Sequence, residues 1–394
     1  MRRLLLVLCL LLLAALPAAA DAKVRKGPGG TAFYTPPSPL PSTESGALIW
    51  ARRLTGTAAL KGGASNRLLL YVSTAETGPT AVSGTLSVPK GRPPKRGWPV
   101  ISWAHGTTGI ADQCAPSRDS ASNPAHDLID YAYPLLRRWL KAGYAVVRTD
   151  YVGLGTPGDH PYLEGRSEAY AVLDAVAAAR KLDKRLSNRV VLAGHSQGGQ
   201  AVLWAASRAP SYRADLRIRG TVALAPVSHL AEQTRLLTNL KEPSALSGLV
   251  AMILRGIDIT RPNLGVSAGL SDRAAPFYPQ TLTECLPALS SPGSLGGIPP
   301  AEVIRAGADT SVVTSALERL VDPEDLTIRT PVRIQQGTED TTVFKAFTDP
   351  LVADYRKRGN PVTYQAYAGV DHGGAVTSPR SARDATRYIR RRLR

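Results

Sequence analysis

The stretch that most constrains the fold is Asn188–Gln200, in which an apolar run leads into a glycine-rich turn and then into an alanine-rich segment. The apolar run, residues 190–193, is typical of a buried strand, and the segment after the turn is typical of a helix. Ser196 lies at the apex of this predicted strand–turn–helix. A serine in such a turn has a strained backbone, so the residues two before and two after it must be small; here both are glycine. The context on both sides predicts a nucleophile elbow, the turn that presents a reactive serine.

The segments around this stretch alternate between strand and helix patterns. Two alternating runs, residues 67–73 and 81–89, predict an antiparallel opening pair, and the continuous apolar run 98–104 predicts a strand that is buried on both faces. The predicted elements that follow are a helix over 128–142, a strand over 144–148, a helix capped by Ser167 and ending at 182, the strand at 190–193, a helix to about 208, and a strand over 221–225. This order predicts an α/β fold with a doubly wound, mostly parallel sheet and active groups at the carboxyl ends of the strands.

The alternation breaks over residues 228–326, which contain no clear strand. A structureless loop of this length does not fit a compact domain, so we expect a helical insertion that caps the core. Its apolar run 249–254 could face a lipid substrate, although a place in the core of the insertion is the simpler interpretation.

The sheet is predicted to resume after the insertion. A strand over 331–336, a helix over 343–358 that Pro350 should kink or split, a strand over 362–367 and a closing helix from Pro379, capped by Ser378, complete the chain. The α/β core is thus predicted in two parts, 67–227 and 327–394.

The N-terminus reads as an export signal, residues 1–20, with two arginines, an apolar stretch and small residues at the cleavage site. We expect cleavage after Ala20 or Ala22; the alternative is a retained anchor, for which the apolar run is short. Residues 23–66 follow as a Pro/Gly-rich N-terminal arm, of which residues 23–45 are expected to wrap as an extended segment rather than pack. The mature protein is therefore expected outside the cytoplasm, secreted, periplasmic or associated with the cell wall.

The formal net charge is +17 over 394 residues. The basic residues are scattered and accompany no recognition motif, which argues against nucleic-acid binding. An arginine-biased solvated surface is the simplest interpretation, and attraction to an anionic membrane or cell wall is the alternative.

Three cysteines are present, of which Cys9 lies in the predicted signal. The other two, Cys114 and Cys285, suggest one disulfide in an exported chain, with two separate thiols as the alternative. Their surroundings lack the ligand spacing of a metal site, so no metal is predicted.

A reactive serine needs a base to take its proton and a carboxylate to fix the tautomer of that base. Of the six histidines, only His372 follows the last predicted strand, where the base belongs. Asp340, in the loop after the strand 331–336, is the predicted acid. Glu339 and Asp371 are the alternatives, and each carboxylate could instead be a turn residue. His195, beside the serine in sequence, is expected to pack against the site or support it.

The oxyanion of an acyl-transfer reaction needs two backbone N–H donors. One should be the amide of Gln197, the residue after the serine. The other should come from the loop after the strand 98–104, which reads His105-Gly106-Thr107-Thr108-Gly109, with Thr107 as the predicted donor. A purely structural turn would also use these glycines.

Several motifs together resemble the bacterial branch of the secretory lipases, which are related to fungal lipase A. They are Phe33-Tyr34 with Pro36-Pro37, the run 103–109, Asp150-Tyr151 with Gly153-Leu154-Gly155, the elbow 194–198, and the segment 336–340. The resemblance covers nearly all of the mature chain and implies an α/β-hydrolase fold with a helical cap over an acyl-binding tunnel.

The resemblance also implies activity on triacylglycerols and simpler esters without a cofactor, with Ser196, Asp340 and His372 on the triad positions. It further implies a disulfide between Cys114 and Cys285, linking the oxyanion loop to the cap. The chain departs from the fungal relatives in its oxyanion loop, where they carry an aspartate.

We therefore expect an exported serine hydrolase acting on carboxylic esters, most simply a triacylglycerol lipase or carboxylesterase. It should need no cofactor and no obligate protein partner, and should contact a lipid interface only transiently. The same triad could serve a polyester depolymerase, a peptidase or an acyltransferase, and a non-catalytic cell-wall or surface-binding protein on this scaffold is an alternative of another class.

Overall fold

A computed structural model describes residues 24–394 with the exception of Thr238. The predicted signal peptide, residues 1–20, its cleavage sites and Cys9 lie outside the described residues. In the described part of the chain, no helix has the length and apolar character needed to cross a membrane.

A single nine-stranded sheet runs through the molecule in the order β1-β2-β3-β5-β4-β6-β7-β8-β9. The first three strands and β5 pair antiparallel, and all pairs from β5 through β4 to β9 are parallel. The strands are β1 (Leu48–Arg53), β2 (Ser65–Ala75), β3 (Gly78–Val88), β4 (Trp98–Ala104), β5 (Ala145–Thr149), β6 (Leu186–His195), β7 (Arg217–Leu224), β8 (Val332–Gly337) and β9 (Val362–Tyr367). The predicted mostly parallel α/β sheet is confirmed, as are the antiparallel opening pair β2–β3 and the fully buried β4.

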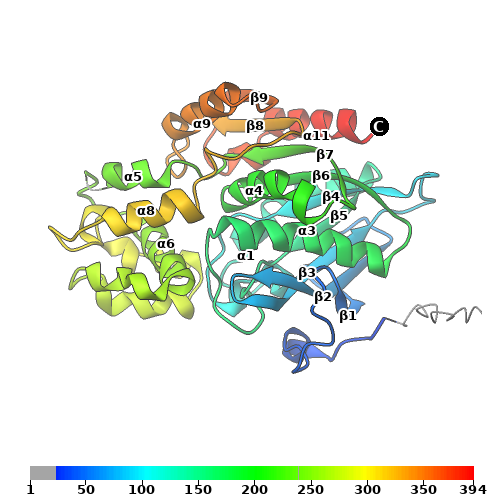
Figure 1. The fold of residues 1–394 in the computed structure, drawn as a ribbon, viewed down its shortest axis with the longest axis horizontal. Helices are drawn as coiled ribbons and strands as arrows, with labels where there is room; N and C mark the ends of the chain where they lie inside the picture. The colour runs from blue at the N-terminus through cyan, green and yellow to red at the C-terminus, as the bar shows by residue number, and fades with distance from the viewer. Residues whose placement is uncertain (1–23, 238) are drawn as a thin grey trace, which may run out of the picture.

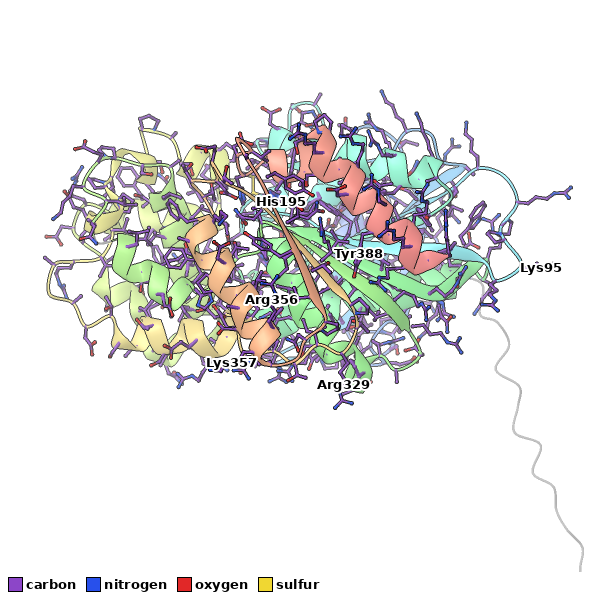
Figure 2. All side chains as sticks on the ribbon, turned by 90° about the horizontal axis from the view of Figure 1, so that it is seen from above. Lys95, His195, Arg329, Arg356, Lys357 and Tyr388 are labelled. Carbon is purple, nitrogen blue, oxygen red and sulfur yellow. A yellow bond between two sulfur atoms is a disulfide. The ribbon has the colours of Figure 1, made fainter. Side chains whose placement is uncertain are left out.

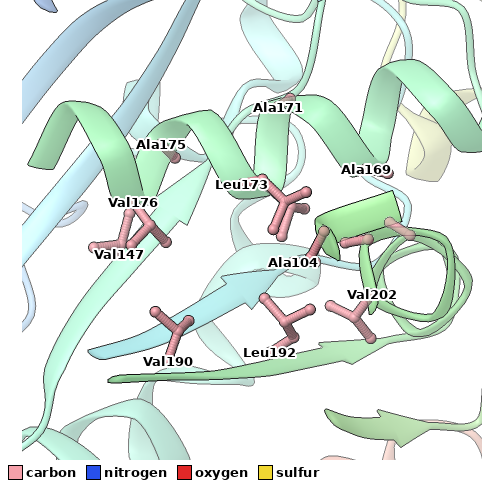
Figure 3. Packing of buried hydrophobic residues seen from close by; sticks show 14 of the residues in the cluster. Ala104, Val147, Ala169, Ala171, Leu173, Ala175, Val176, Val190, Leu192 and Val202 are labelled. Atoms are coloured by element: carbon pink, nitrogen blue, oxygen red, sulfur yellow. The ribbon is translucent and has the colours of Figure 1, made fainter. Parts of the chain in front are cut away.

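Helices cover both faces of this sheet, which makes it doubly wound (Figure 1). One apolar cluster joins the strands to α3 (Gly165–Leu182), α4 (Gln197–Tyr212) and α9 (Lys345–Lys357). Figure 3 shows the alanine-rich α3 packed closely against β4, β5 and β6. The opposite cluster contains α2 (Tyr133–Lys141), α10 (Gly374–Thr377) and α11 (Pro379–Leu393), and α11 lies over the strands in Figure 2. The small side chains on α3 therefore allow this helix to pack closely against the strands β4, β5 and β6.

Between β7 and β8 the described chain is helical and forms a lobe at one end of the sheet (Figure 1). Its helices are α5 (Leu230–Leu237), α6 (Leu246–Thr260), α7 (Leu286–Leu289) and α8 (Ser311–Leu320), with 3-10 turns at Pro262–Leu264, Val266–Gly269, Ala275–Leu282, Leu295–Gly297 and Pro300–Glu302. We refer to residues 228–326 as the helical insertion. Its members have their own apolar cluster, so it packs as a small core beside the sheet.

The structure corrects the predicted arm. Residues 23–45 were expected to wrap without packing, but they contain a 3-10 turn, Gly30–Tyr34, with a buried Phe33, and the predicted arm 23–66 also contains the edge strand β1. The Trp50 indole donates to the Phe33 carbonyl at 3.0 Å, which fastens this turn over β1. Both faces of β1 are therefore covered by apolar groups.

Three helix details also differ from the prediction. The helix expected over 128–142 is two helices, α1 (His126–Asp130) and α2, because Pro134 occupies the first turn of α2, where a missing N–H is tolerated. The cap of α3 is Glu164 rather than Ser167; its carboxylate accepts from the amides of residues 166 and 167. Pro350 does not split α9, which runs continuously from Lys345.

Candidate active site

The backbone at Ser196 has φ 57° and ψ −119°, the strained conformation expected of a serine between a strand and a helix. β6 ends at His195 and α4 begins at Gln197, so Ser196 is the one residue between the strand and the helix. A Cβ at Gly194 would collide with the Gly198 carbonyl, and a Cβ at Gly198 would collide with the Ala104 carbonyl. The two glycines are thus required by the close approach of strand, helix and β4.

Asp340 and His372 come from the loops after β8 and β9 and meet directly. His372 Nδ1 donates to Asp340 Oδ2 at 2.8 Å. The same oxygen accepts from Gln336 Nε2 at 2.9 Å, while Oδ1 accepts from the amides of Thr342 and Val343 at 2.9 and 2.8 Å. Because a carboxylate only accepts, this bond places the imidazole proton on Nδ1 and leaves Nε2 as the basic nitrogen.

The two alternative acids occupy different surroundings. Glu339 is exposed, and its only side-chain contact of note is with Thr338 at 3.4 Å. Asp371 is also exposed, and its carboxylate accepts from the amide of Gly374 at 2.7 Å, as a turn residue does. Asp340 is the only one of the three that is buried and bonded to the histidine ring.

Ser196 and His372 line the same cavity, which has a volume of about 450 Å³. In the part of the chain that the structure describes, no hydrogen bond joins Ser196 Oγ to the His372 ring. Catalytic hydrogen bonds in unliganded enzymes are often long and tighten only when substrate binds. The structure therefore brings all three predicted residues to one site, with the Asp340–His372 pair already formed.

His195 contacts His372 directly, which fits its expected place beside the site. Its Nε2 donates to the carbonyl of His372 at 3.0 Å, and Tyr131 donates to its Nδ1 at 2.6 Å. The rings of His195 and His372 lie 4.5 Å apart. Burial, followed by the neighbouring His372, lowers the pKa of His195 well below its usual value, so the ring stays neutral in this clamp.

The two predicted oxyanion donors come from different elements, Gln197 from the start of α4 and Thr107 from the loop after β4. Gln197 is the first residue of α4, where a backbone N–H has no acceptor within the helix and is free for a ligand. Its side chain turns into the core and donates to Glu168 Oε1 at 2.7 Å. Thr107 lines the cavity, and its hydroxyl bonds to that of Tyr162 at 2.6 Å.

The oxyanion loop is fastened to the helical insertion. Cys114 and Cys285 form a disulfide, as predicted, with a Cα–Cα distance of 5.6 Å. Beside it, the amide of Leu286 donates to the Thr108 carbonyl at 2.9 Å, and Gly109 forms a β-bridge with Cys285. The position of the insertion is therefore coupled to the loop that carries Thr107.

The wall of the cavity opposite the serine is apolar and comes largely from the insertion. The insertion residues that line it include Leu230, Leu237, Leu246, Leu249, Val250, Ile253 and Leu286. The run 249–254 is divided: Leu249 and Ile253 face the cavity, whereas Ala251, Met252 and Leu254 are buried in the core of the insertion. One face of α6 therefore lines the cavity, and another face packs in the core of the insertion, as the simpler interpretation expected.

Several residues that shape the site were not identified from the sequence. Gln336 lies in β8, four residues before Asp340, and this spacing was the one available local signal. Tyr131 and Glu168 are distant in sequence from the groups that they hold. Nothing in a single sequence pairs them with the site.

One surface group among the described residues could hold a metal ion by proximity. Potential ligand atoms of His126, Asp127 and Asp130 lie within 4.8 Å of one another. His126 Nδ1 is already bonded to Asp119 at 2.8 Å, and this bond raises the pKa of the ring. Asp127 of this group also lines the cavity that contains Ser196 and His372.

Comparisons with known proteins agree with this arrangement. A model of the secretory lipase family matches residues 125–290. Lipase A of Moesziomyces aphidis is 29% identical over 198 residues, 48% of this chain and 41% of that protein. A probable inactive lipase of Mycobacterium tuberculosis is 27% identical over 245 residues, 60% of this chain and 53% of that protein. The chain spans about half the length of these relatives.

The fold is also found among solved structures. The rice cell wall degrading esterase LipA from Xanthomonas oryzae superposes with a TM-score of 0.72 at 21% identity, covering 89% of this chain and all of that one (100%). This likeness establishes the fold. The chain has the α/β-hydrolase fold, and over residues 125–290 it is similar to the secretory lipase family.

Proposed function

We propose that the protein is an exported serine hydrolase of carboxylic esters, a triacylglycerol lipase or carboxylesterase, with Ser196, His372 and Asp340 as its triad. The observation that carries the proposal is the 2.8 Å bond between His372 and a buried Asp340, in the same apolar cavity as a strained Ser196. The names of the relatives support the class of substrate.

In the proposed reaction, His372 Nε2 takes the proton of Ser196 Oγ as the oxygen attacks the ester carbonyl. The backbone N–H groups of Gln197 and Thr107 hold the oxyanion. The imidazolium then returns the proton to the leaving alcohol, which gives an acyl-enzyme. A water, deprotonated by the same nitrogen, releases the carboxylic acid and restores the serine.

The apolar wall of the cavity supports a substrate with a hydrocarbon chain. A second cavity of about 780 Å³ lies behind the same wall and shares Leu230, Leu237, Val250 and Ile253 with the first. Side-chain movement in this thin partition would lengthen the space available to an acyl chain. A peptide substrate would instead require polar partners for its backbone groups, which this wall does not provide.

We propose that the helical insertion, residues 228–326, acts as a cap over the serine, between the two core parts 67–227 and 327–394. The disulfide to the oxyanion loop supports this role, because it holds the cap close to the reacting atoms. The transient lipid-interface contact and secretion after cleavage of residues 1–20 belong to the same proposal. Amino-terminal sequencing of the exported protein should begin after Ala20 or Ala22.

The direct test is hydrolysis of p-nitrophenyl esters by the purified mature protein and its Ser196→Ala variant. The wild type should hydrolyse them and the variant should not; equal activity of the two proteins would exclude Ser196 as the nucleophile. Similarity to the family alone does not decide this, because one relative is named as a probable inactive lipase. Emulsified triglycerides, polyesters, peptides and acyl transfer to alcohols, assayed in parallel, separate the alternative activities.

A further inference from the structure

Glu168 is a fully buried carboxyl group on α3 that the proposed chemistry does not use directly. Its Oε1 accepts from the side-chain amide of Gln197 at 2.7 Å and from the backbone amide of Leu163 at 2.9 Å. Gln197 follows the serine in sequence, and Leu163 lines the active-site cavity. A single carboxyl oxygen thus joins the start of α4 to the wall of the site.

The Gln197 amide has a second fixed partner. Its Nε2 lies 3.0 Å from His160 Nε2, and His160 Nδ1 donates to the Val152 carbonyl at 2.8 Å. Because Nδ1 carries the proton, His160 Nε2 accepts from Gln197. Both N–H groups of the amide are therefore used, one by Glu168 and one by His160. The side chain can hold only this orientation without leaving a buried donor unpaired.

We propose that Glu168 is a positioning residue of the oxyanion hole, which anchors the side chain of Gln197 and thereby aims its backbone N–H at the reacting carbonyl. This inference rests on the proposed function. Oxyanion stabilisation depends on donors that are fixed before the charge develops. Loss of the anchor should therefore lower kcat while changing KM little, because the donor matters most in the transition state.

The surroundings of Glu168 add a pH dependence. Burial raises its pKa to about 8, with Glu164 adding to the rise, whereas the bonds from Gln197 and Leu163 oppose it. Tyr151 and Tyr162 are buried phenols with pKa values above their usual range. Burial lowers the pKa of His160 to about 3, so this ring is neutral as well.

No positive side chain bonds to Glu168 in the described part of the chain, and its second oxygen, Oε2, is buried without a hydrogen-bond partner. Ionisation would therefore place an uncompensated negative charge behind the oxyanion. Below pH 8 the group is neutral and the anchor is intact; above pH 8 the new charge opposes the charge of the transition state. The wild-type protein should thus lose kcat as the pH rises through about 8.

Two substitutions separate the anchor from the charge. Glu168→Met removes the acceptor and should lower kcat on p-nitrophenyl butyrate at pH 6.5 by at least about 10-fold and at most about 10³-fold, the upper range for loss of one oxyanion donor. Glu168→Gln keeps a carbonyl acceptor in place and cannot ionise. It should recover most of the kcat at pH 6.5 and abolish the decline above pH 8.

The matched control is Asp174→Asn. Asp174 lies on the same helix, is also buried with a pKa raised by burial, to about 6, and bonds to Ser73 and Tyr212 rather than to the site. Its variant should keep the wild-type alkaline decline. Circular dichroism and thermal unfolding of each variant show whether it is folded.

The outcomes are distinguishable. A wild-type kcat that falls above pH 8, together with a flat profile for Glu168→Gln, supports the inference even if Glu168→Met does not fold. An unchanged alkaline decline in Glu168→Gln overturns it, as does a folded Glu168→Met with wild-type kcat; both leave the proposed function standing. Absence of ester hydrolysis in the wild-type protein overturns the proposed function and this inference together.

Discussion

At the scale of single residues, the Asp340 carboxylate differs from those of Glu339 and Asp371 in the number of hydrogen bonds that it accepts. Its two oxygens accept four hydrogen bonds, two from backbone amides, one from Gln336 and one from His372. Gln336 is held in turn by Thr348, whose hydroxyl donates to its carbonyl at 2.9 Å. This network fixes the orientation of the carboxylate, which the acid of a catalytic triad requires.

Asp340→Asn should lower kcat for ester hydrolysis by about 10⁴-fold, because an amide can donate to His372 and so stabilises the wrong tautomer. Glu339→Gln, in the adjacent exposed position, is the matched control and should stay within about twofold of wild type. Steady-state kinetics on a soluble ester measure both. A larger loss of kcat in Glu339→Gln than in Asp340→Asn would assign the role of the triad acid to Glu339.

The meeting of Ser196, Asp340 and His372 at one site was predictable from the sequence, because each proposed role demands a particular chemistry after a particular strand. The supporting residues were not. Tyr131 and His195 meet across 64 positions, and Glu168 reaches Gln197 from another helix. Such pairs depend on how the helices are placed against the sheet, which a local pattern does not contain.

At the scale of elements, the two ends of the helical insertion are joined by buried carboxyl groups. Asp322 accepts from the amides of Leu230 and Ala231 at 2.7 and 3.0 Å, and Glu324 accepts from the amide of His229. Burial raises the pKa of both carboxyl groups, and the proximity of Asp322 adds to the rise at Glu324. These bonds cap the start of α5 where the chain leaves the core.

A carboxyl group whose pKa is higher in the folded state than in the unfolded state stabilises the fold at low pH. The stabilisation is complete below the pKa of the unfolded state, about 4.3 for Glu, and it is lost as the pH rises through the pKa of the folded state. The midpoint temperature of thermal unfolding should therefore decrease as the pH rises from 5 to 9. Glu324→Gln should make this decrease smaller. Differential scanning calorimetry at pH 5, 7 and 9 measures it.

Asp325→Asn is the control, because the Asp325 side chain is exposed and should leave the slope unchanged. Parallel pH curves for wild type and Glu324→Gln would contradict the role assigned to this buried cluster.

The disulfide is a second link between the insertion and the core. Its two cysteines are 171 residues apart in the sequence, so it closes a long loop of the chain. Replacing both Cys114 and Cys285 by serine should reduce the free energy of unfolding by about 2–5 kcal/mol. Denaturant titration of the mature protein measures this change. Thiol titration of the denatured, unreduced wild type should find no free thiol; two titratable thiols would contradict the bridge.

Some elements were missed for identifiable reasons. β1 carries apolar residues on both faces because the turn at Phe33 covers its outer side, so the polar alternation of an edge strand is absent. The break between α1 and α2 follows from Pro134, which starts a helix more readily than it continues one. The strands β4 and β9 have the bounds that their sequence patterns predicted.

At the scale of the whole molecule, the alternation of strands and helices was enough to predict a doubly wound sheet, because parallel neighbours require crossovers. The exchange of β4 and β5 in the sheet order has no signature in the sequence. The absence of a strand pattern over 228–326 predicted an insertion, whereas the insertion residues that line the same cavity as Ser196 became visible only in the fold.

Covalent labelling is the sharpest test of Ser196 as a nucleophile that His372 activates. The mature protein should be treated with a fluorophosphonate, and the modified residue should be located by peptide mass spectrometry. One adduct is expected, on Ser196; it should be lost in Ser196→Ala and should form far more slowly in His372→Ala. A wild-type protein that forms no adduct, or carries it on another residue, would rule out this role of Ser196.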